Sequence, residues 1–180
     1  LTNQKGLDLV VDKFQDLVKT DLQFVLLGTG DPWYHELFQR YAKKYPNKVA
    51  VQLSFDERSA HEIEAGADIF LMPSRYEPCG LNQLYSLKYG TVPIVRSTGG
   101  LADSITDVRL EPVGTGKANG FCFKDYSADL LFATIVRAMD FFKDNALWTK
   151  IMKNGMLQDW SLEKSAKEYL ALYKKMVKKG

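Results

Sequence analysis

Residues 69–81 read Ile69-Phe70-Leu71-Met72-Pro73-Ser74-Arg75-Tyr76-Glu77-Pro78-Cys79-Gly80-Leu81. Four apolar residues come first, a loop follows, and an amphipathic segment of helical length begins at its end. A short run that is apolar on both faces is typical of a central parallel strand covered by helices on each side. The stretch therefore predicts strand, loop and helix in succession, with the loop at the carboxyl end of the strand.

The same alternation extends over most of the chain and predicts an α/β fold with a parallel sheet. We expect a three-layer, Rossmann-like arrangement in which the last three helices, about 127–178, wrap the rim of the sheet. The predicted strands lie at about 23–27, 49–53, 68–72, 92–95 and 120–123. The predicted helices lie at about 6–19, 33–45, 57–65, 80–89, 101–107, 127–143, 145–157 and 161–178.

The first predicted element is a helix, although a doubly wound sheet normally begins with a strand that leads into its first helix. We therefore expect the first strand to be missing, and the chain to be the C-terminal part of a longer polypeptide. The start at Leu1 instead of methionine agrees with this expectation. The 180 residues fit a single domain, and residues 109–120 are expected to form one long flexible loop.

Composition excludes several classes of protein. Hydrophobic residues make up 46% and charged residues 26% of the chain, as in ordinary globular proteins. The net charge of +2 gives no field that would favour nucleic acid. The basic run of Lys174, Lys175, Lys178 and Lys179 ends a predicted helix, where cations favour the helix dipole.

No apolar stretch approaches the length of about 20 residues that spans a bilayer, and the N-terminus has no signal-peptide pattern. We therefore expect no membrane association. Two cysteines, Cys79 and Cys122, lie far apart and have neither the spacing of metal ligands nor the density of a disulfide scaffold. A reducing compartment fits this pattern.

Two loops are candidates for a phosphate site, because both contain glycine and both lead from a predicted strand into a helix. One is the loop within 73–81, and the other begins with Arg96-Ser97-Thr98-Gly99-Gly100-Leu101. Ligands of open α/β sheets bind at the carboxyl ends of strands, and the amides of Gly80 and Leu81 at a helix start suit an anion. Glu77 either faces the ligand or merely caps a helix or faces water.

Other residues give weaker signals. The loop Leu27-Gly28-Thr29-Gly30-Asp31 lacks the full G-x-G-x-x-G pattern and is interpreted as a tight turn before a helix. Lys5 either approaches a phosphate or is a solvated surface group. His35 and His61 have no partners at metal-ligand spacing, so no metal site is predicted. Trp33, Trp148 and Trp160 are interpreted as core or helix-packing residues.

Several motifs in one order resemble bacterial glycogen synthases and plant starch synthases, and the resemblance covers essentially the whole chain. They are Leu1-Thr2-x-Gln4-Lys5-Gly6-Leu7-Asp8, Pro73-Ser74-Arg75-Tyr76-Glu77-Pro78-Cys79-Gly80-Leu81, Lys88-Tyr89-Gly90-Thr91 and Ser97-Thr98-Gly99-Gly100-Leu101-Ala102-Asp103.

The resemblance implies the two-domain GT-B glycosyltransferase architecture, with residues 1–180 as the C-terminal domain that binds ADP-glucose. The implied reaction adds glucose to the non-reducing end of an α-1,4-glucan, with retention at the anomeric carbon and without a metal or other cofactor. The implied location is the bacterial cytoplasm, or the plastid stroma for a plant or algal protein.

The resemblance also implies roles for single residues. Lys5 matches the lysine on the donor diphosphate, Glu77 the glutamate beside the transferred sugar, and Phe55 an aromatic residue near the adenine. The other implied donor-binding residues are Gly6, Pro78, Cys79, Gly80, Leu81, Thr98 and Gly99. Related families place a second glutamate eight residues after the first, where this chain has Tyr85. No catalytic part is therefore assigned to that position.

The resemblance implies that an N-terminal, acceptor-side domain is absent from these residues, together with its Lys-x-Gly-Gly-Leu loop and catalytic histidine. An arginine that the family carries would precede Leu1. The chain alone is therefore expected to be inactive. Two alternatives stay open: a related GT-B enzyme that uses UDP-glucose or another acceptor, and a non-catalytic module that binds nucleotide or glucan. Glu77 favours an enzyme, because a binding module has no need of a carboxylate at the sugar.

Overall fold

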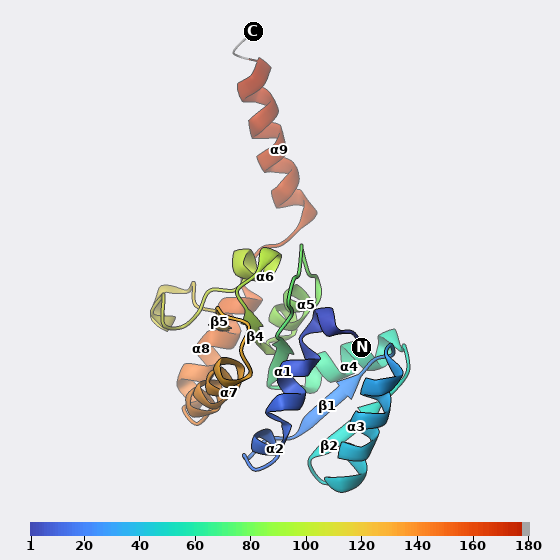
Figure 1. The fold of residues 1–180 in the computed structure, drawn as a ribbon. Helices are drawn as coiled ribbons and strands as arrows, with labels where there is room; N and C mark the ends of the chain where they lie inside the picture. Colours follow the sequence, from blue (N-terminus) through green and yellow to red (C-terminus); the bar gives the residue numbers. More distant parts are fainter. Residues whose placement is uncertain (178–180) are drawn as a thin grey trace.

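The computed structural model describes residues 1–177 of the chain (Figure 1). Its strands are β1 (Phe24–Leu27), β2 (Val49–Gln52), β3 (Ile69–Met72), β4 (Val92–Arg96) and β5 (Phe121–Phe123). Every pairing between them is parallel, as the alternation predicts. Each strand lies within two residues of its expected bounds.

The helices occupy the segments before, between and after these strands. Two are short 3-10 helices, η1 (Asn3–Lys5) and η2 (Val113–Thr115). The α-helices are α1 (Leu7–Asp12), α2 (Phe14–Leu17), α3 (Pro32–Lys44), α4 (Glu57–Gly66), α5 (Asn82–Tyr89), α6 (Gly99–Ser104), α7 (Ala128–Phe142), α8 (Asn145–Met156) and α9 (Leu162–Val177).

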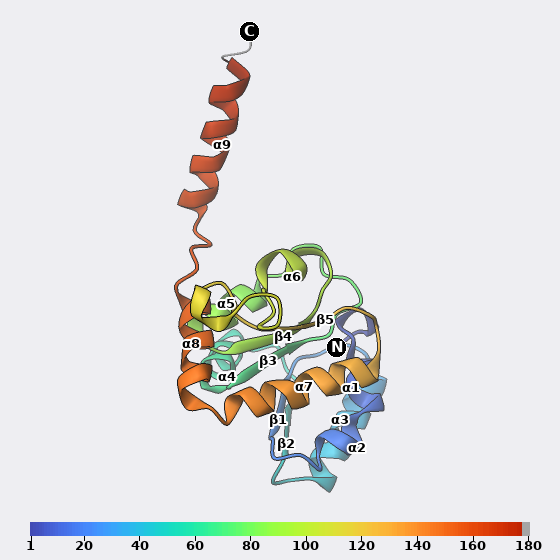
Figure 2. The same ribbon diagram turned by 90° about the vertical axis from the view of Figure 1, so that its left-hand side faces the viewer.

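Helices cover the strands on two faces, so the three-layer expectation is confirmed. On one face, Phe14 of α2 stacks on Tyr41 of α3 with ring centroids 3.9 Å apart, and α1 packs against α7. On the other face, α4 packs against α5. Figure 2 shows β3 and β4 between α7 below and α5 and α6 above.

The strands form two sheets, β1-β2 and β3-β4-β5. Among the described residues, β1 pairs only with β2 and β3 pairs only with β4. The facing edges of β1 and β3 are therefore unpaired, and the break falls between these two strands. This break is where a doubly wound sheet would hold its first strand, which agrees with the expectation that the first strand is missing.

The long first helix expected at 6–19 is wrong in detail. Lys13 has φ −105° and ψ 7°, outside the helical region, and divides the segment into α1 and α2. Phe14 and Leu17 follow the break and are buried in the core. The break therefore directs these two apolar side chains inward. The last helix is predicted to extend to residue 178. Lys178 and Lys179, the last two residues of the basic run, lie outside the described residues.

The C-terminal helices do not all wrap the sheet. Leu131, Ile135 and Ala138 of α7 are buried, and α8 buries Trp148 and Ile151. The helix α9 buries none of its residues and projects away from the body in Figures 1 and 2. The rim prediction is therefore wrong for α9. No described helix is long and apolar enough to cross a membrane.

The loop expected over 109–120 is anchored rather than loose. It contains η2, and the side-chain amide of Asn154 on α8 donates to the carbonyl oxygens of Val113 at 2.9 Å and Ala118 at 2.8 Å. Ala118 and Asn119 are fully buried. The loop therefore belongs to the packed structure.

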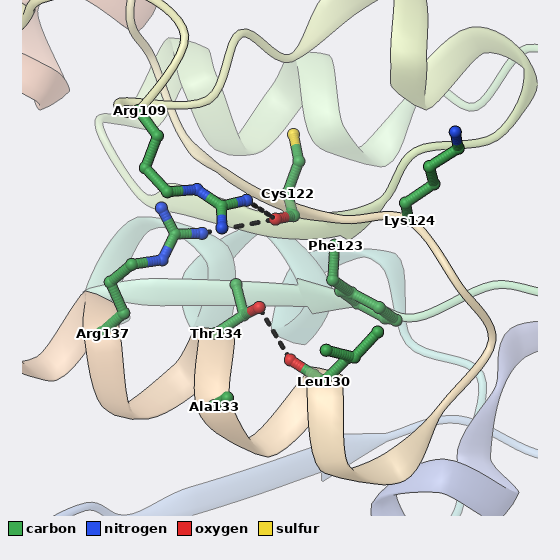
Figure 3. Close-up of a pocket in the computed structure, with 8 residues that line it drawn as sticks. All are labelled: Arg109, Cys122, Phe123, Lys124, Leu130, Ala133, Thr134 and Arg137. Atoms are coloured by element: carbon green, nitrogen blue, oxygen red, sulfur yellow. Dashed lines mark hydrogen bonds between the residues drawn. The ribbon is translucent and has the colours of Figure 1, made fainter.

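A buried carboxylate ties the start of this loop to β5 and α7. Asp107 accepts two hydrogen bonds of 2.9 Å from Arg137 and one of 3.0 Å from Arg109. Both guanidinium groups also donate to the Cys122 carbonyl oxygen, at the edge of a small pocket of about 350 Å³ (Figure 3). Burial alone would raise the pKa of Asp107, but the hydrogen bonds from Arg137 and from the Cys122 amide lower it to about 2.

We predict that Asp107→Asn destabilises the chain by about 2 kcal/mol at neutral pH, because two arginines lose a charged acceptor. The pKa of Asp107 is lower in the folded than in the unfolded chain. The stabilisation is therefore present above the ordinary value of 3.8 and is lost as the pH falls toward 2. Urea unfolding at pH 7 and pH 3 measures this, and the exposed Asp103→Asn is the control. An unchanged difference between the two pH values would contradict the prediction.

Candidate functional site

The loop after β3 positions the candidate site at the carboxyl end of that strand. Ser74 and Glu77 are buried within it, whereas Tyr76 and Leu81 at its surface are exposed. Cys79 is exposed and carries a free thiol. The loop therefore combines a sheltered carboxylate with surface positions that a ligand can reach.

Lys5 and Glu77 form an ion pair across 72 residues of sequence. The Nζ atom of Lys5 donates to Oε2 of Glu77 at 2.7 Å, and the hydroxyl of Ser74 donates to the same oxygen at 3.2 Å. Glu77 is 7% exposed, while the Lys5 side chain is 53% exposed. A sheltered carboxylate and a solvent-accessible ammonium group thus lie side by side. Such a pair suits a ligand that has both an anionic group, for the lysine, and a neutral polar group, for the carboxylate.

The N-terminal segment holds Lys5 against this loop. The amide of Arg75 donates to the Gln4 carbonyl oxygen at 2.8 Å, and the Gln4 side chain donates to the Tyr76 carbonyl oxygen at 3.2 Å. Gly6 has φ 72°, and a Cβ there would overlap the carbonyl oxygen of Pro73. Gly6 is therefore needed for the close approach that brings Lys5 to Glu77.

Gly99 and Gly100 hold the loop after β3 from its other side. Gly100 donates its amide to the Glu77 carbonyl oxygen at 3.0 Å. A Cβ on Gly99 would overlap the same oxygen, and a Cβ on Gly100 would overlap the carbonyl oxygen of Cys79. The two candidate loops predicted from the sequence therefore meet in space.

We predict that Gly100→Ala displaces the loop around Cys79 and lowers stability by about 1–3 kcal/mol, because the added methyl group has no room beside the backbone. Ligand affinity at the loop should fall with it. Gly66→Ala is the matched control, since a Cβ on Gly66 meets nothing within 4 Å. Thermal melts of both variants check the prediction, and equal melting temperatures would contradict it.

The loop leads directly into α5. Gly80 has φ 71°, and Leu81 precedes the helix without a side-chain cap. The first amides of a helix have no acceptor within it, so they remain available to an anion. The buried side chain of Gln83 donates to the carbonyl oxygens of Cys79 at 3.2 Å and Gly80 at 3.1 Å and thereby fixes the turn.

Sequence reasoning missed three supporting residues. Ser74 and Gln83 bind the loop from within, as described above. Arg96 at the end of β4 donates to the Ser74 carbonyl oxygen at 2.8 Å and also to the Arg75 carbonyl oxygen. Their common signal is a polar residue next to a strand end or helix start, which is too frequent in sequences to single them out.

Among the remaining predicted site residues, Phe55 and Thr98 lie at the carboxyl ends of other strands. Phe55 follows β2 and is 88% exposed. Thr98 precedes α6 in an extended conformation without a side-chain cap. Pro78 is exposed beside Cys79. No finding tests their roles in ligand binding, which stay predictions.

The weaker candidates have structural roles. Asp31 caps α3 by accepting from the Trp33 amide at 2.9 Å, with Pro32 as the first helical residue. His35 accepts from the Gly30 amide at 3.0 Å, which holds the turn between β1 and α3. His61 contacts the Tyr89 hydroxyl at 3.3 Å. The described residues contain no group of three or more His, Cys, Asp or Glu that could hold a metal ion.

The tryptophans differ from one another. Trp148 is a core residue as expected, stacked near Phe121. Trp33 and Trp160 are about half exposed, so neither is a core residue, and the alternative that they pack helices stays a prediction. Trp33 contacts Tyr34 edge-on, and Trp160 lies beneath the Lys164 ammonium group. Both residues lie at the surface, Trp33 in the first turn of α3 and Trp160 just before α9.

Comparison with known proteins gives a consistent result. The family model described as Glycosyl transferases group 1 matches residues 1–154. The glycogen synthase of Hydrogenovibrio crunogenus is 49% identical over 98% of this chain and 36% of that protein. The glycogen synthase of Bacillus anthracis is 46% identical over 98% of this chain and 37% of that protein. The chain thus spans a little over a third of the curated relatives it matches.

Solved structures show the same relationship. The catalytic domain of starch synthase IV from Arabidopsis thaliana, bound to ADP and acarbose, matches with a TM-score of 0.86 and 33% identity. The match covers 99% of this chain and 37% of that chain. The sucrose-phosphate synthase of Thermosynechococcus elongatus matches with a TM-score of 0.68, at 21% identity and over 99% of this chain and 44% of that one, and shows the fold alone.

Proposed function

Because the chain belongs to the group 1 glycosyl transferases, we propose that it forms the donor-binding side of a retaining glucosyltransferase of the glycogen and starch synthase type. The enzyme would transfer glucose from ADP-glucose to the non-reducing end of an α-1,4-glucan. The glycogen synthases at 46–49% identity support this assignment. A location in the bacterial cytoplasm is part of the proposal, in keeping with the bacterial sources of these relatives.

The observation that carries the proposal is the Lys5–Glu77 pair beside the start of α5. Negative charge grows on the diphosphate as the sugar leaves, and an ammonium group with fixed amides stabilises that charge. Lys5 and the amides at Leu81 supply both. Glu77, sheltered next to them, would contact the hydroxyls of the transferred sugar and its developing positive charge.

The nucleotide would extend from this point toward the other strand ends. Phe55 is exposed after β2 and offers an aromatic face for the adenine. Gly6, Thr98 and Gly99 would line the path of the diphosphate, together with the loop at Pro78. The proposal includes no metal ion. Glucosyl transfer that persists after treatment with EDTA would agree with a reaction that needs no metal ion.

Titration of the chain with ADP, UDP and maltoheptaose in a calorimeter tests the proposal. We expect ADP to bind, UDP to bind at least tenfold more weakly, and binding of ADP to fail in Glu77→Gln/Lys5→Ala. Preference for UDP would support a related transferase with another donor. If maltoheptaose binds and neither ADP nor UDP does, the proposal is overturned in favour of a glucan-binding module.

We predict that residues 1–180 alone transfer no detectable glucose to maltoheptaose, although they bind ADP. Orientation of donor against acceptor supplies much of an enzyme's rate, and the resemblance places the acceptor side in another domain. Transfer from radiolabelled ADP-glucose measures this. The positive control is a chimera in which this chain replaces the matching third of the Hydrogenovibrio crunogenus relative. Turnover by the chain alone would contradict the prediction.

A further inference from the structure

Three side chains that are not among the predicted site residues join the segments that surround the site. They are Asp8 of α1, Arg75 of the loop after β3, and Tyr126 of the segment between β5 and α7. Asp8 is separated in sequence from Arg75 by 67 positions and from Tyr126 by 118. We call these three residues the anchor cluster. It connects parts of the chain that no local pattern brings together.

Asp8 is the centre of the anchor cluster, because each of its carboxylate oxygens accepts from a different partner. Oδ2 accepts from the guanidinium group of Arg75 at 2.6 Å, and Oδ1 accepts from the Tyr126 hydroxyl. Burial and the hydrogen bond to Asp8 raise the pKa of Tyr126. The hydroxyl therefore remains a donor to Asp8 even well above neutral pH.

The ring of Tyr126 also supports two guanidinium groups. The Cζ atom of Arg75 lies 4.2 Å from the ring centroid, and that of Arg96 lies 5.6 Å from it. A cation over an aromatic face is attracted by the negative charge of that face. The two arginines would repel each other, but the Asp8 carboxylate offsets the charge of Arg75. The ring and the carboxylate together therefore keep both arginines beside the loop.

Both arginines are bound to the loop after β3. Arg96 donates to the carbonyl oxygens of Ser74 and Arg75. The backbone amide of Arg75 donates to the Gln4 carbonyl oxygen at 2.8 Å, while its side chain reaches Asp8, four residues after Gln4. Arg75 therefore holds the N-terminal segment at two points, one through its backbone and one through its guanidinium group.

The two members of the Lys5–Glu77 ion pair lie within the region that these contacts fix. Lys5 lies between Gln4 and Asp8, and Glu77 lies two residues after Arg75. The Lys5 side chain is 53% exposed, and a long side chain in contact with solvent loses rotamer freedom when it is held in one geometry. The attraction of such a pair is weak, so its geometry depends on the backbone at both ends.

The anchor cluster also decides which cation Glu77 pairs with. A guanidinium group binds carboxylates strongly and often with two hydrogen bonds, and Arg75 is close to Glu77 in sequence. In the structure, Glu77 accepts from Lys5 and Asp8 accepts from Arg75. Each carboxylate is thus paired with one cation, and Asp8 leaves Glu77 to the lysine.

We propose that Asp8, Arg75 and Tyr126 are positioning residues, which set the geometry of the Lys5–Glu77 pair and act on the reaction only through that pair. The effect on glucosyl transfer rests on the proposed function, whereas the effect on the loop does not. Loss of the cluster releases the N-terminal segment from the loop, so Lys5 and Glu77 spend less time in the reactive geometry. A loss of orientation lowers the rate of reaction more than it weakens binding.

The first test is Asp8→Asn in the chimera with the Hydrogenovibrio crunogenus relative. Asparagine keeps the size of the side chain but removes its charge and one acceptor. We expect kcat to fall about tenfold or more while the KM for ADP-glucose stays within a few-fold. Hydrogen exchange of the Arg75 amide should become about tenfold or more faster. The Val92 amide, which donates to the Asp68 carbonyl oxygen in the sheet, reports global unfolding and should change less.

Asp129→Asn is the matched control. Asp129 of α7 pairs with Lys13, the residue that follows α1. This pair also joins the N-terminal segment to α7, but it includes no residue of the loop after β3. We expect the control to leave kcat and the exchange of the Arg75 amide unchanged.

Tyr126→Phe is a milder variant that remains informative if Asp8→Asn folds poorly. It removes the hydroxyl and keeps the ring beside Arg75 and Arg96, so kcat should fall by about threefold. In the double variant Asp8→Asn/Tyr126→Phe the loss should be little greater than in Asp8→Asn alone, because both changes remove the same hydrogen bond. Losses that multiply would show that the residues act independently and would overturn the proposal.

Two other results would also overturn it. One is a lowered Tm in Asp8→Asn with unchanged kcat, which would make the cluster a structural feature alone. The other is unchanged exchange of the Arg75 amide. If the unaltered chimera transfers no glucose from ADP-glucose, the proposed function fails, and the exchange of the Arg75 amide still decides whether the anchor cluster holds the loop.

Discussion

Glu77→Gln, made in the chimera with the Hydrogenovibrio crunogenus relative, is expected to lower kcat by about 100-fold or more and to leave the KM for ADP-glucose within a few-fold. Glutamine keeps the shape of the side chain and removes its charge. If the carboxylate stabilises positive character on the sugar in the transition state, its loss affects kcat without a matching rise in KM. Steady-state kinetics over a range of ADP-glucose concentrations measure both constants.

The structure adds a control to this prediction. Because Glu77 accepts from both Lys5 and Ser74, its neutral variant could also change stability. Thermal melts of the same chimera therefore accompany the kinetics. A lowered Tm with kcat within a few-fold of the unaltered chimera would show that Glu77 is a structural residue and would contradict the catalytic assignment.

Most of the fold could be predicted because its signals are local. Apolar runs of four or five residues mark the strands, and each lies close to its predicted bounds. The turn at Asp31-Pro32 follows directly from an N-cap side chain and a first-turn proline. These signals act within a few residues, so no knowledge of tertiary contacts is needed.

The errors arise where a distant contact decides the local structure. The break at Lys13 allows Phe14 to meet Phe24, Phe38 and Tyr41, and no pattern within the first helix contains that information. The exposure of α9 is the opposite case. Its amphipathic pattern predicts a covered face, but nothing in the pattern says which surface would cover it.

The candidate site shows the same division. Glycine-rich loops at strand ends could be recognised one at a time. Their meeting could not, since it depends on Gly99 and Gly100 passing the backbone of Glu77 and Cys79. The family resemblance gave Lys5 and Glu77 separate roles around the donor and did not predict their ion pair, in which Nζ and Oε2 lie 2.7 Å apart. The roles of Ser74, Gln83 and Arg96 became visible only in three dimensions.

Lys5→Ala is the second variant with a large expected effect. In the chimera it should lower kcat/KM for ADP-glucose by about 10- to 150-fold, because a charge-assisted contact with phosphate contributes about 1.5–3 kcal/mol. From the sequence, a surface lysine would change stability by under about 0.5 kcal/mol. The ion pair alters this second expectation: the variant leaves the buried Glu77 carboxylate without its cation, although solvent reaches Lys5 and weakens the pair.

We therefore expect Lys5→Ala to destabilise the chimera by on the order of 1 kcal/mol, and a double variant resolves what this loss means for activity. In Lys5→Ala/Glu77→Gln the unpaired charge is gone, so Tm should return toward that of the unaltered chimera, while kcat/KM should fall about 10-fold or more below that of Glu77→Gln alone. Lys19→Ala, which removes a largely exposed lysine far from the loop in sequence, should change neither quantity. If the double variant is as active as Glu77→Gln alone, Lys5 acts only by holding Glu77, and its contact with the donor phosphate is refuted.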